Sequence, residues 1–434
     1  MTKLLASRRI IMKERVRIGY IGLGRRGTAV LKQCISEMND VEVTAVCDLN
    51  PAKMENAVSI LTEKNSPAPK CYANHHDLLQ DPQLDAVMIM TSWNSRIQLA
   101  IDTMEAGIPV AIEVGCAYDI SECWKLVDAY EKTGVPCMML ENSCYARREM
   151  MIYKLAKEGF FGRIVQCTGG YHHYLNDVEL YGKNADGSWD TDHYRLAEYA
   201  HRNCENYPTH ELGPISKILN INRGNRMLSL RSFATEPCGL AAYTKDHVTE
   251  DHPFCNADFR QGDIVTTIIT CAGGEQIILT LDTTLPRPYY SRGFTVRGTK
   301  GMVTEVNRRV ATYFAEGMEE EIFNNEAEFF EKHDHPLHRE YLSQTKGGHN
   351  GVDWLVSRAF IESVKRGIEP PIDVYDAAVW LSIAPLSEAS IAAGGAAIEF
   401  PDFTKGKWFR REPEVPQKYS LGVIVEDPDT PIVP

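Results

Sequence analysis

The chain has 434 residues, 44% hydrophobic and 24% charged, a globular composition that is long enough for two domains. Its formal net charge of -13 argues against a nucleic-acid partner, because binding to phosphates requires a basic surface. A membrane span needs a run of about 18 apolar residues, and since the sequence has none we expect no membrane partner.

The first part of the chain alternates predicted strands and helices. Strands are expected at 16–21, 41–47, 86–90, 110–113 and 136–140, and helices at 28–38, from 51, at 96–106 and at 121–133. Strands that alternate with helices need crossover connections, which make the strands parallel. Residues 13–142 are therefore predicted to form a Rossmann domain with a doubly wound parallel sheet.

A glycine-rich loop follows the first strand and opens the first helix. Its sequence at 22–27 is Gly-Leu-Gly-Arg-Arg-Gly, and Asp48 ends the second strand. Such glycines permit a tight turn and let the backbone approach a pyrophosphate, while a carboxylate about twenty residues later binds the ribose hydroxyls. Asp48 would repel a 2'-phosphate, which favours NAD over NADP, although Arg25 or Arg26 could meet one. The alternative is a flavodoxin-type glycine turn, which would bind no nucleotide.

After residue 142 the pattern changes. A helix is expected at 148–158, strands at 164–169, 228–233, 263–270, 276–283 and 293–298, and helices at 354–366 and 374–393. Short turns such as 272–274 join neighbouring strands, which indicates an antiparallel sheet. Residues 143–434 are thus predicted to form an α+β domain with a large, mainly antiparallel sheet, whose helices near 354–393 pack back toward the first domain. The polar segment 174–192 predicts an exposed insertion near a site.

The cysteines and histidines indicate neither disulfides nor a metal. None of the twelve cysteines forms a Cys-x-x-Cys pair, so buried free thiols in a reducing compartment are expected. We predict a cytoplasmic protein; residues 1–12, which include Arg8 and Arg9, are also compatible with a trimmed leader and hence a periplasmic one. The segment 171–173 with His193 and His201 could be read as a metal cluster, but its irregular spacing favours solvated or substrate-lining roles.

Two further sequence blocks narrow the class of enzyme. Thr91-Ser92-Trp93 and the run from Ala106 to Glu113 resemble the glucose–fructose oxidoreductase and inositol dehydrogenase superfamily. The usual pattern there ends Glu-Lys-Pro, and its lysine helps to polarise the reacting hydroxyl. This chain has Glu113-Val114-Gly115 instead, which disfavours a plain sugar dehydrogenase of that type.

The complete set of motifs resembles glycoside hydrolase family 109, over about residues 16–408. The motifs are Glu113-Val114, Cys137-Met138-Met139-Leu140-Glu141-Asn142, Cys144-Tyr145, Tyr207-Pro208-Thr209-His210, Asn220-Ile221-Asn222-Arg223-Gly224, Pro286-Arg287-Pro288-Tyr289, Gly298-Thr299-Lys300-Gly301, Asp353-Trp354-Leu355-Val356 and Pro371-Ile372-Asp373-Val374-Tyr375-Asp376.

This resemblance implies an NAD-dependent glycoside hydrolase that acts on a terminal hexose or N-acetylhexosamine, the founding activity being removal of α-N-acetylgalactosamine. The implied cycle oxidises the sugar C3 hydroxyl, removes the C2 proton, eliminates the C1 leaving group, adds water and reduces C3 again. One alternative is a net dehydrogenase that releases a 3-keto product. Another is a sugar- or NAD-sensing binding protein, which the intact tyrosine and histidine motifs disfavour. Related folds often pair through the open sheet face, so a homo-oligomer is expected.

The resemblance also assigns candidate site residues. The cofactor contacts expected are Gly22, Gly24, Arg26, Gly27, Asp48, Trp93, Asn94, Arg96, Glu113, Val114 and Asn142. The substrate contacts expected are Tyr171, Arg195, Tyr207, Pro208, Thr209, His210 and Tyr289. His210 is the predicted acid/base at the C3 hydroxyl, since imidazole titrates near neutral pH. Tyr289 is the first candidate for the group that transfers the C2 or leaving-group proton, and the adjacent Tyr290 is the second. Tyr145 and Tyr207 are further candidates.

Some of these residues have structural alternatives. Arg195 could pair with Asp192 or Glu198, and Tyr289 could pack locally in its proline-rich turn. The family usually carries Trp-x-Trp-His where this chain has the segment 93–96, Trp-Asn-Ser-Arg, and glycine where Glu211 stands. Both departures are expected to surround the sugar pocket, and they weaken the carry-over of N-acetylgalactosamine specificity.

Overall fold

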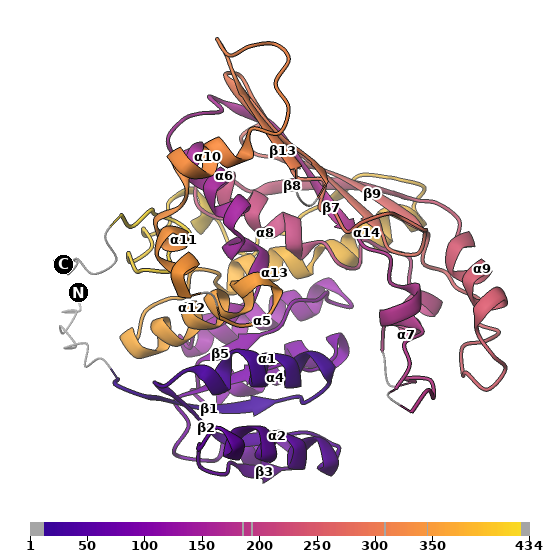
Figure 1. Cartoon of the computed structure of the whole chain (residues 1–434), viewed down its shortest axis with the longest axis vertical. Helices are drawn as coiled ribbons and strands as arrows, with labels where there is room; N and C mark the ends of the chain where they lie inside the picture. The colour runs from indigo at the N-terminus through magenta and orange to yellow at the C-terminus, as the bar shows by residue number, and fades with distance from the viewer. Residues whose placement is uncertain (1–12, 185, 192–193, 308–309, 345, 427–434) are drawn as a thin grey trace.

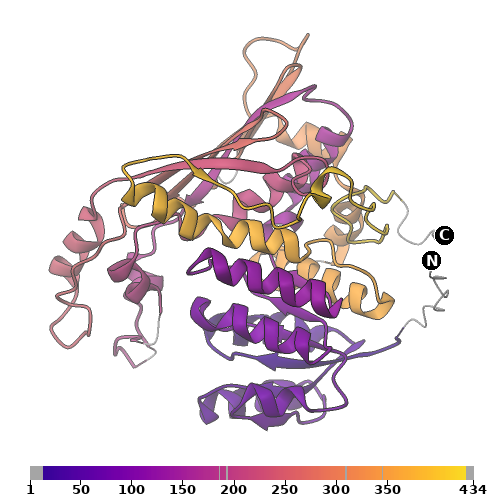
Figure 2. The same cartoon turned by 180° about the vertical axis from the view of Figure 1, so that it is seen from behind.

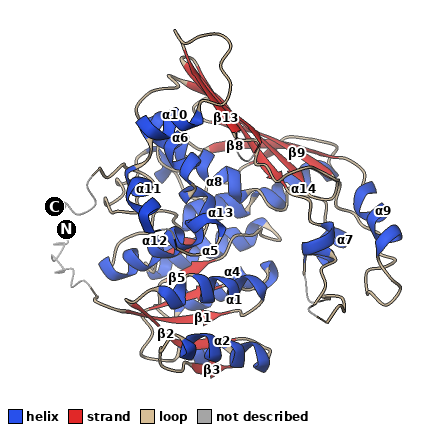
Figure 3. Cartoon of the chain, in the orientation of Figure 1, coloured by secondary structure: helices blue, strands red, loops and turns tan. Residues whose placement is uncertain are grey.

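The computed structural model describes residues 13–184, 186–191, 194–307, 310–344 and 346–426. Figure 1 shows a lower layer that holds the N-terminal sheet and an upper layer that holds the long strands of the second sheet. Helices lie between the two sheets, as the colouring by secondary structure in Figure 3 makes clear. The predicted fold class is therefore confirmed: a Rossmann domain followed by an α+β domain.

The first sheet is parallel, with the strand order β3-β2-β1-β4-β5-β6. Its elements are β1 (Val16–Ile21), α1 (Arg25–Gln33), β2 (Val41–Cys47), α2 (Pro51–Glu63), β3 (Lys70–Tyr72), α3 (His75–Leu79), β4 (Ala86–Ile89), α4 (Trp93–Glu105), β5 (Val110–Ile112), α5 (Ile120–Thr133) and β6 (Cys137–Met139). Every residue of β4, β5 and β6 is buried, because helices cover both faces of the sheet. The strand order reverses between β1 and β4, and ligands of such sheets bind at the carboxyl ends beside this reversal.

The second sheet has eight strands in the order β13-β12-β11-β7-β10-β9-β8-β14. They are β7 (Ile164–His172), β8 (Met227–Ala234), β9 (Ile264–Cys271), β10 (Gln276–Asp282), β11 (Thr295–Gly298), β12 (Gly301–Asn307), β13 (Val310–Ala315) and β14 (Ile398–Glu399). Only β7 and β10 pair in parallel. Burial alternates along β9 and β10, so one face of the sheet carries the core.

Helices fill the space between the two sheets. Those of the second domain are α6 (Arg147–Lys157), α7 (Arg195–His201), α8 (Thr209–Ile218), α9 (Cys238–His247), α10 (Glu326–His333), α11 (Pro336–Tyr341), α12 (Val352–Arg366), α13 (Val374–Leu381) and α14 (Ile383–Ala392). Helix α8 packs on β7 and α14 packs on β8, while α12 contacts β1, and α13 contacts α5 and β6. Figure 2, from behind, shows the last helices lying along the first domain.

Two sequence expectations about helices and loops need correction. The single helix expected at 374–393 is two helices, because Pro385 in the first turn of α14 has no N–H to donate to the preceding turn. The insertion at 174–192 is not wholly exposed: Leu175, Leu180 and Tyr181 are buried in a small satellite core. No helix among the described residues is long and apolar enough to cross a bilayer.

Candidate active site

The glycine loop has the geometry that a bound dinucleotide requires. Gly22 has a φ of 94°, and a Cβ on Gly27 would lie 2.2 Å from the carbonyl oxygen of Gly22. Neither position could therefore carry a side chain without strain. A Cβ on Gly24 would meet nothing within 4 Å, so the backbone at the start of α1 lies open. The open loop and the helix N-terminus fit a pyrophosphate.

Asp48 stands where the ribose of NAD would be bound. Its Oδ2 accepts a hydrogen bond from the Leu23 N–H at 2.7 Å, and its Oδ1 accepts one from the Asn50 N–H at 2.9 Å. These bonds fix the carboxylate beside the glycine loop, at the end of β2. Each oxygen keeps a further lone pair for a ribose hydroxyl.

The two arginines of the loop are both engaged by carboxylates from beyond the loop. Arg26 Nη1 and Nη2 donate to the two oxygens of Asp353 at 2.7 Å each, and its Nε donates to Glu113 at 3.1 Å. Arg25 pairs with Glu179. Two carboxylates around Arg26 oppose a 2'-phosphate at that side chain, which strengthens the preference for NAD.

Other predicted cofactor contacts gather at the same place. Asn142 Nδ2 donates to Asp353 at 2.7 Å, and Glu113 Oε1 accepts the Val114 N–H at 3.1 Å. Glu113 follows β5 and Asn142 follows β6, so both lie at the carboxyl edge of the parallel sheet. The structure thus brings Arg26, Glu113, Val114 and Asn142 together around Asp353, which the sequence analysis did not assign to the site.

The segment 93–96 opens α4 and has a structural role as well. Arg96 is buried and donates to the backbone carbonyls of Val114 and Thr91, whereas Asn94 is exposed and accepts from Ser92. A Cβ on Gly115 would lie 2.5 Å from the Trp93 ring, so glycine is needed there. Arg96 is therefore tied to the backbone of the cofactor domain, and this departure from the family pattern does not place a new charge among the sugar-site side chains.

Several aromatic side chains gather beside the cofactor residues. We call the set formed by Trp93, Tyr171, His173, Tyr207, His210 and Tyr290 the aromatic cluster. The ring of Tyr207 is at its centre, 4.5 Å from Tyr171, 5.0 Å from His210 and 6.1 Å from Trp93, between ring centroids.

Arg195 completes the cluster as its cation. Its guanidinium lies 4.7 Å from the Tyr207 ring centroid and 5.7 Å from that of Trp93, a cation–π geometry. Of the two acids expected as alternative partners, Glu198 accepts from the Tyr118 hydroxyl and Asp192 lies outside the described residues. A set of aromatic rings beside a cation suits a sugar, which offers C–H faces and hydroxyls.

His210 is oriented by a buried carboxylate. Its Nδ1 lies 2.8 Å from Glu141 Oε1, and Glu141 is fully buried. Burial alone would raise the pKa of Glu141, but the charge and hydrogen bond of His210 and the Ser143 N–H hold it below its ordinary value. An ionised Glu141 accepts the Nδ1 proton, so Nε2 is left as the nitrogen that exchanges a proton. Pro208 and Thr209, both buried, begin the helix that carries His210.

The candidate tyrosines lie in different surroundings. Tyr289 is 43% exposed and its hydroxyl donates to the Val306 carbonyl at 3.2 Å, whereas Tyr290 lies 6.0 Å from Tyr171 within the cluster. Tyr145 is buried elsewhere, and its hydroxyl donates to the Tyr419 carbonyl at 2.8 Å. The structure therefore places Tyr290 in the aromatic cluster, and places Tyr289 and Tyr145 outside it.

Tyr171 and His173 form a second hydrogen-bonded pair in the cluster. The Tyr171 hydroxyl lies 2.9 Å from His173 Nδ1. Burial raises the pKa of Tyr171 to about 12, although Arg195 opposes the rise, and burial lowers the pKa of His173. Burial also raises the pKa of Tyr207 and of Tyr290. These tyrosines are therefore protonated at neutral pH, and neutral His173 can accept a proton from Tyr171.

Glu211, the second departure from the family pattern, is buried against β7. A Cβ on Gly169 would lie 2.6 Å from the Glu211 Cβ, and Glu211 Oε1 forms an ion pair with Arg292 Nε at 3.0 Å. Burial raises the pKa of Glu211 well above its usual range, with Glu149 and Glu305 nearby. A glycine in β7 makes room for this side chain, whose charge contributes to the raised pKa of Tyr290 in the aromatic cluster.

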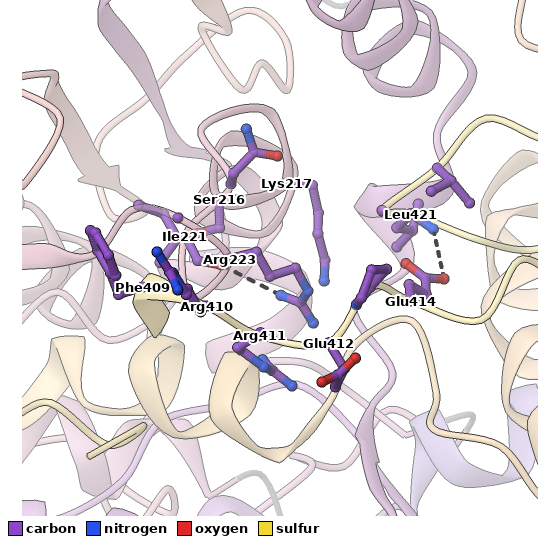
Figure 4. A pocket seen from close by; sticks show the side chains of 15 residues that line it. Ser216, Lys217, Ile221, Arg223, Phe409, Arg410, Arg411, Glu412, Glu414 and Leu421 are labelled. Carbon is purple, nitrogen blue, oxygen red and sulfur yellow. Dashed lines mark hydrogen bonds between the residues drawn. The ribbon is translucent and has the colours of Figure 1, made fainter. Parts of the chain in front are cut away.

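The chain also has a cavity of about 280 Å³ at the far end of α8, which Figure 4 shows. Lys217 and Arg223 line it, but both are paired, with Asp376 at 2.6 Å and Asp373 at 2.8 Å. These ion pairs tie the end of α8 to the start of α13. The charged residues that line the cavity therefore have a structural role, at the end of α8 opposite His210.

Among the described residues, one group of side chains could gather around a metal ion: His75, His76 and Asp102, on α3 and α4. His75 Nε2 lies 2.8 Å from Asp102. His173 and His201 do not belong to this group, and His193 lies outside the described residues.

Comparison with known proteins shows which families this chain resembles. Residues 16–141 match an oxidoreductase family with an NAD-binding Rossmann fold, and residues 145–410 match the C-terminal domain of glycosyl hydrolase 109. The solved structure of levoglucosan dehydrogenase in complex with NADH aligns with a TM-score of 0.67 at 16% identity, covering 89% of this chain and 99% of that one. The fold and glycine loop therefore define an enzyme of the oxidoreductase fold with NAD as its cofactor.

Two relatives identify the family. A glycosyl hydrolase family 109 protein of Stenotrophomonas maltophilia is 37% identical, over 92% of this chain and 91% of its own length. An α-N-acetylgalactosaminidase of Tannerella forsythia is 36% identical, over 92% and 88%. The chain belongs to glycosyl hydrolase family 109.

Proposed function

We propose that this enzyme hydrolyses the glycosidic bond of a terminal sugar through transient oxidation at C3, with an α-linked N-acetylgalactosaminide as the first substrate to test. The name of the Tannerella relative supports this choice of sugar. Of the two departures from the family pattern, Arg96 donates to the backbone carbonyls of Val114 and Thr91, and Glu211 forms an ion pair with Arg292. The observation that carries the proposal is the His210–Glu141 pair in an aromatic cluster beside the cofactor residues.

The chain's own residues supply the proton transfers. Bound NAD supplies a reversible two-electron oxidation of a sugar carbon. His210 Nε2 takes the proton of the C3 hydroxyl, since Glu141 holds the imidazole proton on Nδ1, and it returns that proton when C3 is reduced. Arg195 and the cluster tyrosines are donors for the charge that grows on the C3 oxygen when C2 loses its proton.

We assign the C2 proton to the Tyr171–His173 pair. A ketone at C3 acidifies the C2–H bond, so a base near the sugar can remove that proton and the C1 leaving group departs. Tyr171 takes up the C2 proton while it passes its phenolic proton to neutral His173, and Arg195 offsets part of the cost that burial adds to the phenolate. Tyr207 and Tyr290 are neutral donors, suited to the leaving-group oxygen.

One assay separates hydrolysis from net oxidation. The enzyme, without added NAD, is incubated with aryl glycosides of several sugars in both anomers, while aglycone release and absorbance at the NADH band are followed. We expect aglycone release without NADH accumulation and, in heavy water, deuterium at C2 of the product. Accumulation of NADH with a 3-keto product would establish the dehydrogenase instead, and a product without deuterium would exclude elimination through C2.

A further inference from the structure

We propose that Asp353 is a positioning residue. Through it the second domain fixes the cofactor-binding side chains in one arrangement and so retains NAD between turnovers. The inference concerns the cofactor alone and does not rest on the proposed reaction. It assigns a role in cofactor retention to a side chain from α12, outside the Rossmann domain.

Asp353 is buried and receives several donors. It lies in the first turn of α12 and is 3% exposed. Its Oδ1 accepts from Arg26 Nη2 and Asn142 Nδ2, and its Oδ2 accepts from Arg26 Nη1 and contacts His349 Nδ1, all at 2.7 Å. A buried carboxylate with a bidentate arginine holds its partners in one geometry. The hydrogen bonds of Arg26 and His349 outweigh burial and keep the pKa of Asp353 far below its usual range.

The residues that Asp353 holds are cofactor contacts expected from the sequence. Arg26 comes from the glycine loop after β1, and Asn142 follows β6, three strands away in the sheet. Arg26 in turn donates to Glu113, which accepts the Val114 N–H. One carboxylate of the second domain therefore orders the carboxyl ends of three strands of the first.

Ordering of this kind bears on how firmly a ligand is held. Side chains that are already fixed lose little freedom when the ligand binds, so affinity rises mainly through slower release. If Asp353 loses its charge, Arg26 keeps Glu113 as a partner but loses its bidentate clamp, and Asn142 loses its acceptor. The loop and the strand ends then move independently, and NAD escapes faster.

The same helix offers a matched control. Arg358, also on α12, donates to Asp40 of the first domain at 2.6 Å, and Lys365 donates to Asp40 at 2.8 Å. This ion pair also joins the two domains, but Asp40 precedes β2 at the opposite end of the strands. Among the described residues its side chain pairs with Arg358 and Lys365 and with none of the predicted cofactor residues. Asp40→Asn weakens the domain contact without touching the cofactor residues.

The test measures NAD release directly. The purified full chain is loaded with NAD and desalted, retained NAD is quantified by chromatography after denaturation, and release is timed against a trapping dehydrogenase. We expect Asp353→Asn to release NAD at least ten times faster than the wild type, and Asp40→Asn to release it within twofold of wild type. Activity of Asp353→Asn on an aryl glycoside, where the wild type is active, should recover with added NAD.

A purely structural role gives a different result. If Asp353→Asn folds with a lower melting temperature but releases NAD at the wild-type rate, the proposal is overturned. If Asp353→Asn does not fold, Asp353→Glu keeps the charge while displacing it by one methylene group. Faster release from that variant supports the proposal, and unchanged release overturns it. Since the readout is NAD itself, an enzyme that proves not to be a glycosidase leaves this test intact.

Discussion

A buried carboxylate lies at each end of the segment 205–210, Glu205 within the segment and Glu141 in contact with His210, and the two differ in protonation. Glu141, which meets His210, is fully buried, and Glu205 is 1% exposed. His210 keeps the pKa of Glu141 low against the effect of burial, whereas burial raises the pKa of Glu205 to about 8. Within the described part of the chain, Glu205 Oε2 has no hydrogen-bond partner. At equal burial, a charged neighbour therefore determines whether a carboxylate is ionised.

The largest effect is expected from His210→Ala. Removing the acid/base should lower turnover about 10²–10⁴-fold, the range for general acid–base catalysis. His75→Ala is the control, because His75 also lies 2.8 Å from a carboxylate, Asp102, but in a half-exposed pair on α3 and α4. Turnover is measured with the best aryl glycoside. Equal losses of turnover in the two variants would contradict the assignment of His210 as the acid/base.

Glu141→Gln should have the next largest effect. Its amide can no longer hold the imidazole proton on Nδ1 by charge, so we expect roughly 10²-fold slower turnover and a shifted pH profile. Glu205→Gln makes the same change at the other end of the segment, where no histidine is oriented, and should leave turnover within a fewfold. The pH dependence of kcat for both variants distinguishes a lost partner from general damage. A wild-type profile in Glu141→Gln would contradict the assigned pair.

The tyrosines repeat the comparison on a smaller scale. Tyr171→Phe removes the hydroxyl that pairs with His173, and we expect about 10²-fold slower turnover, while the product that still forms carries deuterium at C2. Tyr289→Phe removes a half-exposed hydroxyl bonded to a backbone carbonyl, and turnover should stay within twofold. If Tyr289→Phe is the more damaging change, the original sequence ranking stands and the cluster has been misassigned.

The sequence predicted the first domain well because its signals are local. The strands that became β1, β2, β4, β5 and β6 are short apolar runs bounded by polar residues, and the glycine loop lies between a strand and a helix as the motif requires. Helix α8 was missed, because Pro208, Gly213 and Pro214 all argue against a helix there, and tertiary packing on β7 overrides that preference. Strands β12 and β13 were missed as well.

The sequence predicted many of the residues that gather at the site, but not which of them are hydrogen-bond partners. His210 was expected near the sugar, yet its partner lies far away in the sequence and belongs to another motif. Glu141 is 69 residues from His210, and Asp353 is 327 residues from Arg26. Such pairs depend on how α8 and α12 dock on the first domain, which no local pattern encodes. Tyr289 and Tyr290 show the same limit: neighbours in a loop point to opposite surroundings, and only the fold tells which faces the site.

The smallest effect on turnover, with a clear effect on stability, is expected from Glu205, which is buried and accepts a backbone hydrogen bond from Tyr207. The folded-state pKa of Glu205, about 8, lies above its ordinary value of 4.5, so the folded protein binds a proton that the unfolded chain has released between these pH values. This group's contribution to stability is therefore fully present below pH 4.5 and falls by about 1.4 kcal/mol per pH unit until the pH passes 8.

Glu205→Gln keeps the shape of the protonated acid and cannot ionise, so its stability should not fall through that window. Melting temperatures of wild type and variant between pH 5 and pH 9 should converge at the acid end and separate at the alkaline end, with the variant higher. Parallel curves would mean that Glu205 finds a partner in solution, as Glu141 does in His210. The contrast between the two ends of the segment would then lie in catalysis alone and not in charge.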